Sequence, residues 1–422
     1  MNFRFRLAVA LLGTLLVAAS VTAQRRDVFI ESRDHAAIRY STAPTTDAVS
    51  ELNKRLEAGT ATLRFEAASG YLRSVLEALD VPVESQALVF SQTSLQGPRI
   101  NVRNPRAVYF NDSVAVGWVR GGDILEVSAH DPHQGVVFYQ LDQDRSRPPR
   151  LTRNDDCLAC HLSWDTVGVP GLTLHSVHPL PDEDSYVIGY YTTHGSPLEQ
   201  RWGGWFVTGD HGGAAHMGNI PVMPADKGKL ALRDPRAPIE SVDDLFVATG
   251  YPTPYSDVVA LLVLAHQTHM TNLITRAGWE ARLAAAAPGR ESELRVQEAA
   301  RALADYMVFV YEAPLAGPVK GSSGFAAAFS AIGPRDGKGR SLRELDLRRR
   351  LFRYPLSYMI YTEAFDALPA SAREAVYARL WDVLSGRDTH ERYSHLTAAD
   401  RQAVIEILRD TKKDLPAYFR PT

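Results

Sequence analysis

The run from Ala107 to Tyr139, AVYFNDSVAVGWVRGGDILEVSAHDPHQGVVFY, decides the expected fold of this chain. It contains four short runs rich in β-branched and aromatic residues, separated by Asn-Asp, Gly-Gly and Asp-Pro pairs. Such pairs favour turns, and strands that follow one another without an intervening helix favour an antiparallel meander. The large aromatic side chains of these runs are expected to fill the core of the sheet: Tyr109, Phe110, Trp118, Phe138 and Tyr139.

The segments around the meander define the rest of the predicted organisation. Residues 24–85 combine an irregular lead-in with two helices, the second of them over 63–79. Strand-like runs continue from 86 to 220, and residues 221–254 form a linker rich in proline and aspartate. Helical periodicity dominates 255–422. The sequence therefore predicts an α+β protein with an antiparallel β-rich region followed by an α-helical region.

Within the helical region, individual elements can be placed. A long helix is expected from Asp257 to Leu283 because apolar residues recur along one side of it. Residues 314–340 are rich in glycine and serine and are expected to form a loop. Further helices are expected over 341–352, 355–367, 371–384 and 397–411.

The first 23 residues have the pattern of a secretory signal peptide. Arg4 and Arg6 precede an apolar run from Leu7 to Ala19, and Val21-Thr22-Ala23 supplies small residues near a cleavage site. An uncleaved signal anchor is the alternative. We expect cleavage near Ala23 and a periplasmic or otherwise exported protein. No later apolar run reaches the length of a membrane span, and the longest covers 258–265.

The two cysteines of the chain lie in one short motif, Cys157-Leu158-Ala159-Cys160-His161. Two thiols three residues apart lie on one face of a helical turn, and an imidazole follows directly. This pattern resembles the haem attachment motif of c-type cytochromes. The resemblance covers five residues. It implies one covalently attached haem c, thioether bonds at Cys157 and Cys160, and iron coordination by His161.

The rest of the chain does not resemble a small class I cytochrome c. Such a protein is a compact helical domain of about 100 residues, as the family resemblance implies, whereas this motif lies between runs of strands. The export signal agrees with the motif, because c-type cytochromes as a family are matured outside the cytoplasmic membrane.

Arginines precede the motif and are candidates for contacts with the haem propionates. Arg150 and Arg153 are the nearest, and guanidinium groups pair well with carboxylates. The alternatives are a solvated loop or a docking surface for an acidic partner. We name Arg153 as the predicted cofactor-binding residue.

The second axial ligand of the iron is open in the sequence. Met217 lies on a glycine-rich loop together with several histidines, and it is the first candidate. His266 is the second candidate, because it shares a helix face with His269. An iron without a second protein ligand is the remaining possibility.

The predicted function is one-electron transfer by an exported monohaem cytochrome, with a redox partner protein. The alternative is a haem-dependent oxidoreductase, peroxidase-like, or a sensor of peroxide or another small oxidant, for which His194, His211 and Arg201 are candidate distal residues. A redox disulfide or half of a zinc site is a third possibility. The net charge is −3 and there is no long basic tract, so nucleic acid is not expected as a partner.

Overall fold

In the computed structural model, which describes residues 33–177, 189–219 and 237–420, the meander is the central sheet. Its six strands are hydrogen-bonded in the order in which they occur along the chain, and every neighbouring pair is antiparallel. The strands are β1 (Ala87–Val89), β2 (Arg106–Phe110), β3 (Val114–Val119), β4 (Ile124–Asp131), β5 (Gly135–Asp142) and β6 (Thr152–Arg153). The predicted meander is confirmed.

One face of the sheet packs against the N-terminal helices α2 (Ala48–Glu57) and α3 (Leu72–Ala78). Side chains alternate between the faces of a strand, so Tyr109, Trp118 and Tyr139 all point toward these helices. Tyr139 donates a hydrogen bond to Asp47 at 2.6 Å, and Asp47 caps α2. The predicted aromatic core lies here, except for Phe110 and Phe138, which point to the other face.

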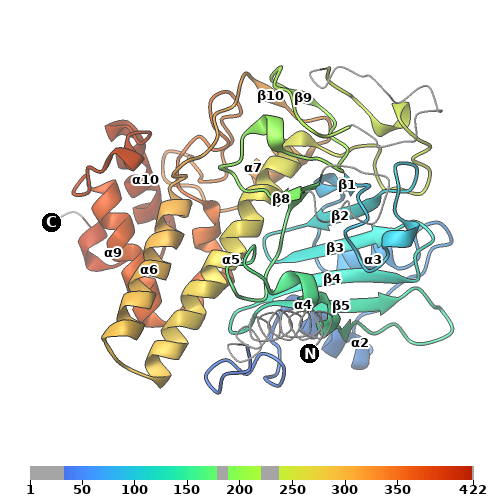
Figure 1. Ribbon diagram of the computed structural model, residues 1–422, viewed down its shortest axis with the longest axis horizontal. Coiled ribbons are helices and arrows are strands. Elements are labelled where there is room, and N and C mark those ends of the chain that lie inside the picture. The colour runs from blue at the N-terminus through green and yellow to red at the C-terminus, as the bar shows by residue number, and fades with distance from the viewer. Residues whose placement is uncertain (1–32, 178–188, 220–236, 421–422) are drawn as a thin grey trace, which may run out of the picture.

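Helix α5 (Val258–Ala286) passes along the other face of the sheet and joins the two halves of the molecule. Figure 1 shows the sheet on one side of α5 and helices α6, α9 and α10 on the other. The remaining helices are α4 (Leu158–His161), α6 (Arg290–Met307), α7 (Phe325–Ala331), α8 (Glu363–Asp366), α9 (Ala370–Leu384) and α10 (Ala398–Thr411). The mixed α+β architecture is therefore as predicted, and it is not a small cytochrome fold.

The length and apolar composition of α5 would allow it to cross a membrane, which the sequence analysis did not expect of any later segment. The most apolar window of the helix is 94% buried inside the protein, so its composition is that of a core helix.

Several predicted elements are wrong. Residues 341–352 are irregular because Leu347 has a φ of +55° and the Asp346 carboxylate accepts hydrogen bonds from the amides of Arg348 and Arg349. The predicted loop over 314–340 contains helix α7 and strand β10 (Val319–Lys320). The predicted helix over 63–79 is reduced to α3, because Gly70 has a φ of +63°.

Two small antiparallel sheets lie beside the main one. Strand β7 (His175–Val177) pairs with β8 (Gly189–Tyr191), and β9 (Asp210–His211) pairs with β10. The main chain of Gly203 packs directly on Val177, so the loop between β8 and β9 lies against β7. The predicted signal peptide lies outside the described residues.

Candidate haem attachment site

The Cys157–His161 motif forms a tight helical turn directly after the last strand of the main sheet. A 3-10 turn (Asp155–Cys157) leads into α4, and the side chain of Asn154 caps it by accepting a hydrogen bond from the Asp156 amide at 3.0 Å. Cys157 is half-buried and Cys160 is exposed, and neither is in a disulfide. The turn thus presents two separate thiols, as the motif predicts.

The imidazole of His161 is held in one orientation. Its Nδ1 lies 2.9 Å from the carbonyl oxygen of Gly171, and its ring packs 4.7 Å from the Phe138 ring. A carbonyl oxygen can only accept, so Nδ1 carries the proton and Nε2 keeps its lone pair. Burial lowers the pKa of His161 to about 4, although the Gly171 contact opposes this shift. A neutral imidazole with a free Nε2 can serve as a metal ligand.

The position of the Gly171 carbonyl depends on helix α5. The side-chain amide of Asn272 donates to the Leu172 carbonyl and accepts from the Leu172 amide, both at 2.8 Å. A Cβ at position 171 would lie 2.3 Å from Asn272 Oδ1, so only glycine allows this close approach. Helix α5 therefore fixes the loop that orients His161.

The thiol of Cys157 does not have the properties of a reactive thiolate. Burial raises its pKa to about 11, and the nearby carboxylate of Glu126 acts in the same direction. Redox-active cysteines instead depend on a lowered pKa. In the described part of the chain, no group of three or more histidine, cysteine or acidic side chains could hold a metal ion.

Arg106 and Glu126 form an ion pair on the sheet face that carries Phe138. The guanidinium of Arg106 crosses above Gly117, where a Cβ would lie only 2.4 Å from Nη2. Its positive charge also acts to lower the pKa of both Cys157 and His161. Arg106 Nε is buried and has no hydrogen-bond partner among the described residues. Arg106 is a donor beside the motif that the sequence analysis missed, because nothing in its local sequence marks it.

The guanidinium of Arg153, the predicted propionate-binding residue, contacts other residues of the chain. It donates to Asp155 and to the Tyr40 carbonyl, both at 2.8 Å, and it lies 4.4 Å from the centre of the Tyr40 ring. Its register partner is Tyr139, so it lies on the opposite sheet face from Phe138. Arg150 pairs with Glu57. The role of Arg153 stays a prediction.

Met217 lies close to β7 and β8. Its sulfur is 3.8 Å from Ser176 Oγ and 3.9 Å from the Tyr190 hydroxyl. Ser176 and His175 are neighbours in β7, so their side chains point to opposite faces of that strand. Iron coordination by Met217 stays a prediction.

His175 lies on the side of β7 away from Met217. A charge on its ring lowers the pKa of His161. Its Nε2 is buried and lies 3.4 Å from an Asp165 oxygen, but the two atoms do not have the geometry of a hydrogen bond. Sequence reasoning missed this residue, because a single histidine in a strand carries no motif.

The predicted distal residues His194, His266 and Arg201 lie in a separate polar cluster in the interior, whereas His211 lies outside it in β9. His194 Nδ1 lies 3.0 Å from His266 Nδ1, and His266 Nε2 lies 2.8 Å from the Ser357 hydroxyl. His269 pairs with the Tyr191 hydroxyl at 3.0 Å. Arg201 donates to the carbonyls of Ser196 and His194, both at 2.7 Å. Since their polar atoms are engaged within this cluster, these contacts do not point to an open distal site.

The residues beside the motif fit a c-type haem in donor type. Two unpaired thiols and a neutral, oriented imidazole adjoin the buried Arg106 Nε, a donor that a propionate could satisfy.

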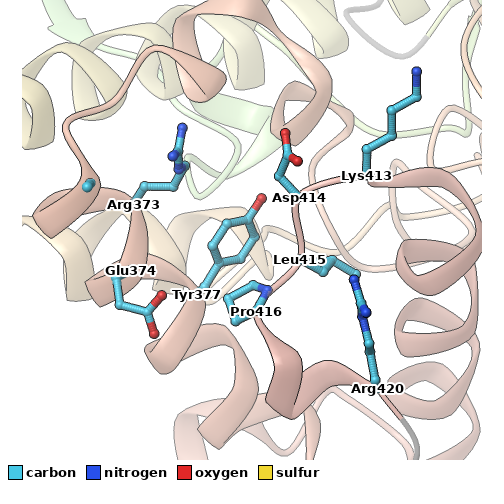
Figure 2. A pocket seen from close by; sticks show the side chains of 9 residues that line it. Arg373, Glu374, Tyr377, Lys413, Asp414, Leu415, Pro416 and Arg420 are labelled. Carbon is cyan, nitrogen blue, oxygen red and sulfur yellow. The ribbon is translucent and has the colours of Figure 1, made fainter.

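A cleft of about 450 Å³ lies elsewhere, between α9 and the C-terminal segment. Figure 2 shows Tyr377 among the residues that line it, near Arg373 and Asp414. None of the predicted site residues lines this cleft. Its size does not make it the functional site, because the groups suited to cofactor chemistry are at the cysteine turn.

Comparisons with protein families, curated proteins and solved structures find no match to this chain.

Proposed function

We propose that this protein is an exported monohaem c-type cytochrome that transfers single electrons. One haem would be attached covalently through Cys157 and Cys160, and His161 would bind its iron. The observation that supports the proposal most strongly is the hydrogen bond between His161 Nδ1 and the Gly171 carbonyl. Iron-binding histidines commonly make such a contact, because it fixes the tautomer and orients the ring.

The chain's own residues would act by holding the ligand and shaping its surroundings. The Gly171 carbonyl keeps the proton on Nδ1 and increases the electron density at Nε2. Phe138 covers one side of the imidazole and limits access of water. When bound, haem supplies reversible one-electron oxidation and reduction at iron. A rigid ligand favours this chemistry, since little has to move when the charge changes.

The exposure of Cys160 suggests how electrons would enter and leave. Cys160 is exposed and Cys157 is half-buried, so a haem held through both would be within reach of a redox partner protein.

The proposal is tested by producing the protein in a host with a c-type haem maturation system. Haem is expected to stay attached after denaturation, and the Cys157→Ser, Cys160→Ser double variant is expected to lose it. His161→Ala should keep the attached haem but change its absorption spectrum, because the iron loses a ligand. A wild-type protein without attached haem would refute the proposal.

The same material tests the second axial ligand. If Met217 binds iron, the oxidised protein shows a methionine–iron charge-transfer band that Met217→Ala abolishes. His266→Ala and His175→Ala are the matched comparisons. A band that survives Met217→Ala excludes this ligand, and a turnover assay with peroxide and a reduced donor then separates an electron carrier from an enzyme.

A further inference from the structure

Three buried rings near β7 leave all their polar atoms without partners. Trp202, His211 and His216 are 1%, 1% and 3% exposed. No hydrogen bond within the described chain reaches Trp202 Nε1 or either ring nitrogen of the two histidines. Buried polar groups in native proteins are almost always paired, so five unpaired nitrogens in one cluster require an explanation.

The three rings are in mutual contact. The ring centres of His211 and His216 are 4.5 Å apart, and those of Trp202 and His216 are 5.3 Å apart. Both pairs meet edge to face. Gly218 packs closely against His216, because a Cβ at that position would lie 2.5 Å from Val207 Cγ2 and 3.0 Å from His216 Nδ1. The cluster thus combines unsatisfied donors with a neighbouring position that has no side chain.

The chemistry of the cluster favours a ligand with oxygen acceptors. A neutral imidazole carries one N–H and an indole carries one, so the three rings offer three donors. A cation would use only the histidine lone pairs and would leave these donors unpaired. No set of three metal-binding side chains exists in the described residues. Neighbouring N–H donors are instead suited to an oxyanion.

We propose that Trp202, His211 and His216 form a binding site for a carboxylate or a similarly small oxyanion. Two sources can supply this group: a free anion, or a propionate of the haem of the proposed function. The inference rests on the three rings alone and does not require the haem.

The test follows the indole N–H signals in nuclear magnetic resonance spectra of protein labelled with [15N]tryptophan. The chain contains six tryptophans. Trp202→Phe assigns the signal of Trp202, and Trp279 serves as an internal control because its N–H already donates to the Gln134 carbonyl. Sodium formate is titrated into the haem-loaded protein and into the Cys157→Ser, Cys160→Ser variant. Wild-type chain produced without haem maturation replaces this variant if it does not fold.

We expect formate to shift the Trp202 signal of the haem-free protein and to leave the Trp279 signal in place. His211→Phe, which keeps a ring but removes both nitrogens, should weaken formate binding about tenfold or more, since a hydrogen bond to a charged group is lost. His133→Ala, at an exposed histidine, should have no effect.

The outcomes separate the sources. A formate shift in both forms identifies a free oxyanion. A shift only in the haem-free form, with the Trp202 signal of the haem-loaded form already at the bound position, identifies a propionate. No shift in either form means that ordered water fills the site, and the inference fails. It also fails if Zn²⁺, but not formate, shifts the signal and His211→Phe abolishes that effect. Absence of attached haem would remove only the propionate source.

Discussion

At the scale of single residues, the decisive contact is the one between His161 and Gly171. Its geometry depends on an absent side chain, because Asn272 occupies the space where a Cβ at position 171 would lie. The same amide holds both polar atoms of the Leu172 main chain. The orientation of the proposed iron ligand is therefore set by a residue on another element, about a hundred positions later in the chain.

Gly171→Ala should displace this loop. We expect the free energy of unfolding to fall by about 1–3 kcal/mol, because the added methyl group overpacks a closed site. The haem-loaded protein should also show altered low-spin iron signals in electron paramagnetic resonance. Urea unfolding measures the first effect. Gly324→Ala is the control, since the nearest atom to its Cβ would be Glu84 Cγ at an ordinary 3.7 Å. Equal losses in both variants would contradict the argument.

The cysteine motif can be recognised from the sequence alone, but the residues that surround it in the fold cannot. Cys157, Cys160 and His161 are adjacent in sequence, so their chemistry is visible without a structure. Arg106 and Glu126 meet only because their strands flank β3, and Gly117 leaves space for the guanidinium. Arg153 is close to the motif in sequence, but strand alternation places it on the opposite sheet face from Phe138.

At the scale of elements, helix α5 depends on its N-cap residue. Asp257 is fully buried, and its Oδ1 accepts hydrogen bonds from the amides of Val259 and Ala260 at 2.7 and 3.2 Å. Its Oδ2 accepts from the amide and the hydroxyl of Ser323 at 2.7 and 2.8 Å. One carboxylate thus caps the central helix and also anchors the segment before α7.

Asp257→Ala should destabilise the protein by about 2 kcal/mol or more, which exceeds the usual cost of losing a helix cap. Thr397→Ala removes a cap of α10 that is more exposed, and it should cost only about 1 kcal/mol. Chemical denaturation of the two variants measures the difference. A loss at Asp257 no larger than that at Thr397 would mean that the Ser323 contacts contribute nothing.

The element predictions succeeded where local pattern and fold agree. The meander was predictable because its strands pair with their immediate neighbours and turn residues separate them. Residues 341–352 have a helical composition, but Leu347 adopts a left-handed conformation and the segment packs as an irregular strap. Helix α7 was missed because glycines and serines on both sides concealed a short run of alanine and phenylalanine.

At the scale of the whole molecule, buried histidines couple stability to pH. Burial lowers the pKa of His130 to about 4, that of His266 to about 3 and that of His269 to about 4. In the unfolded chain these groups titrate near 6.5. Between these pKa values the unfolded state binds more protons than the folded state. The stability that these histidines contribute as neutral rings is therefore fully present above about pH 6.5 and is lost as the pH falls.

We therefore expect the free energy of unfolding to drop by up to about 1.4 kcal/mol per pH unit for each of the three histidines between pH 6.5 and 4. Urea unfolding at pH 7.5, 6 and 5 measures the slope. His269→Gln should reduce this slope by the contribution of one titrating histidine. His133→Gln, at an exposed histidine, should leave the slope unchanged. A slope that is flat over this range would contradict the neutral state of the buried rings.

The sequential order of the six strands has a consequence for how the molecule is made. Each strand pairs with the one before it, so the sheet can form before the rest of the chain is available to fold. It can be complete when Cys157 appears, whereas Asn272 follows more than a hundred residues later. During that interval the cysteine turn would be tethered to a folded sheet but not yet locked by α5, which leaves time for a maturation enzyme to act before the structure closes.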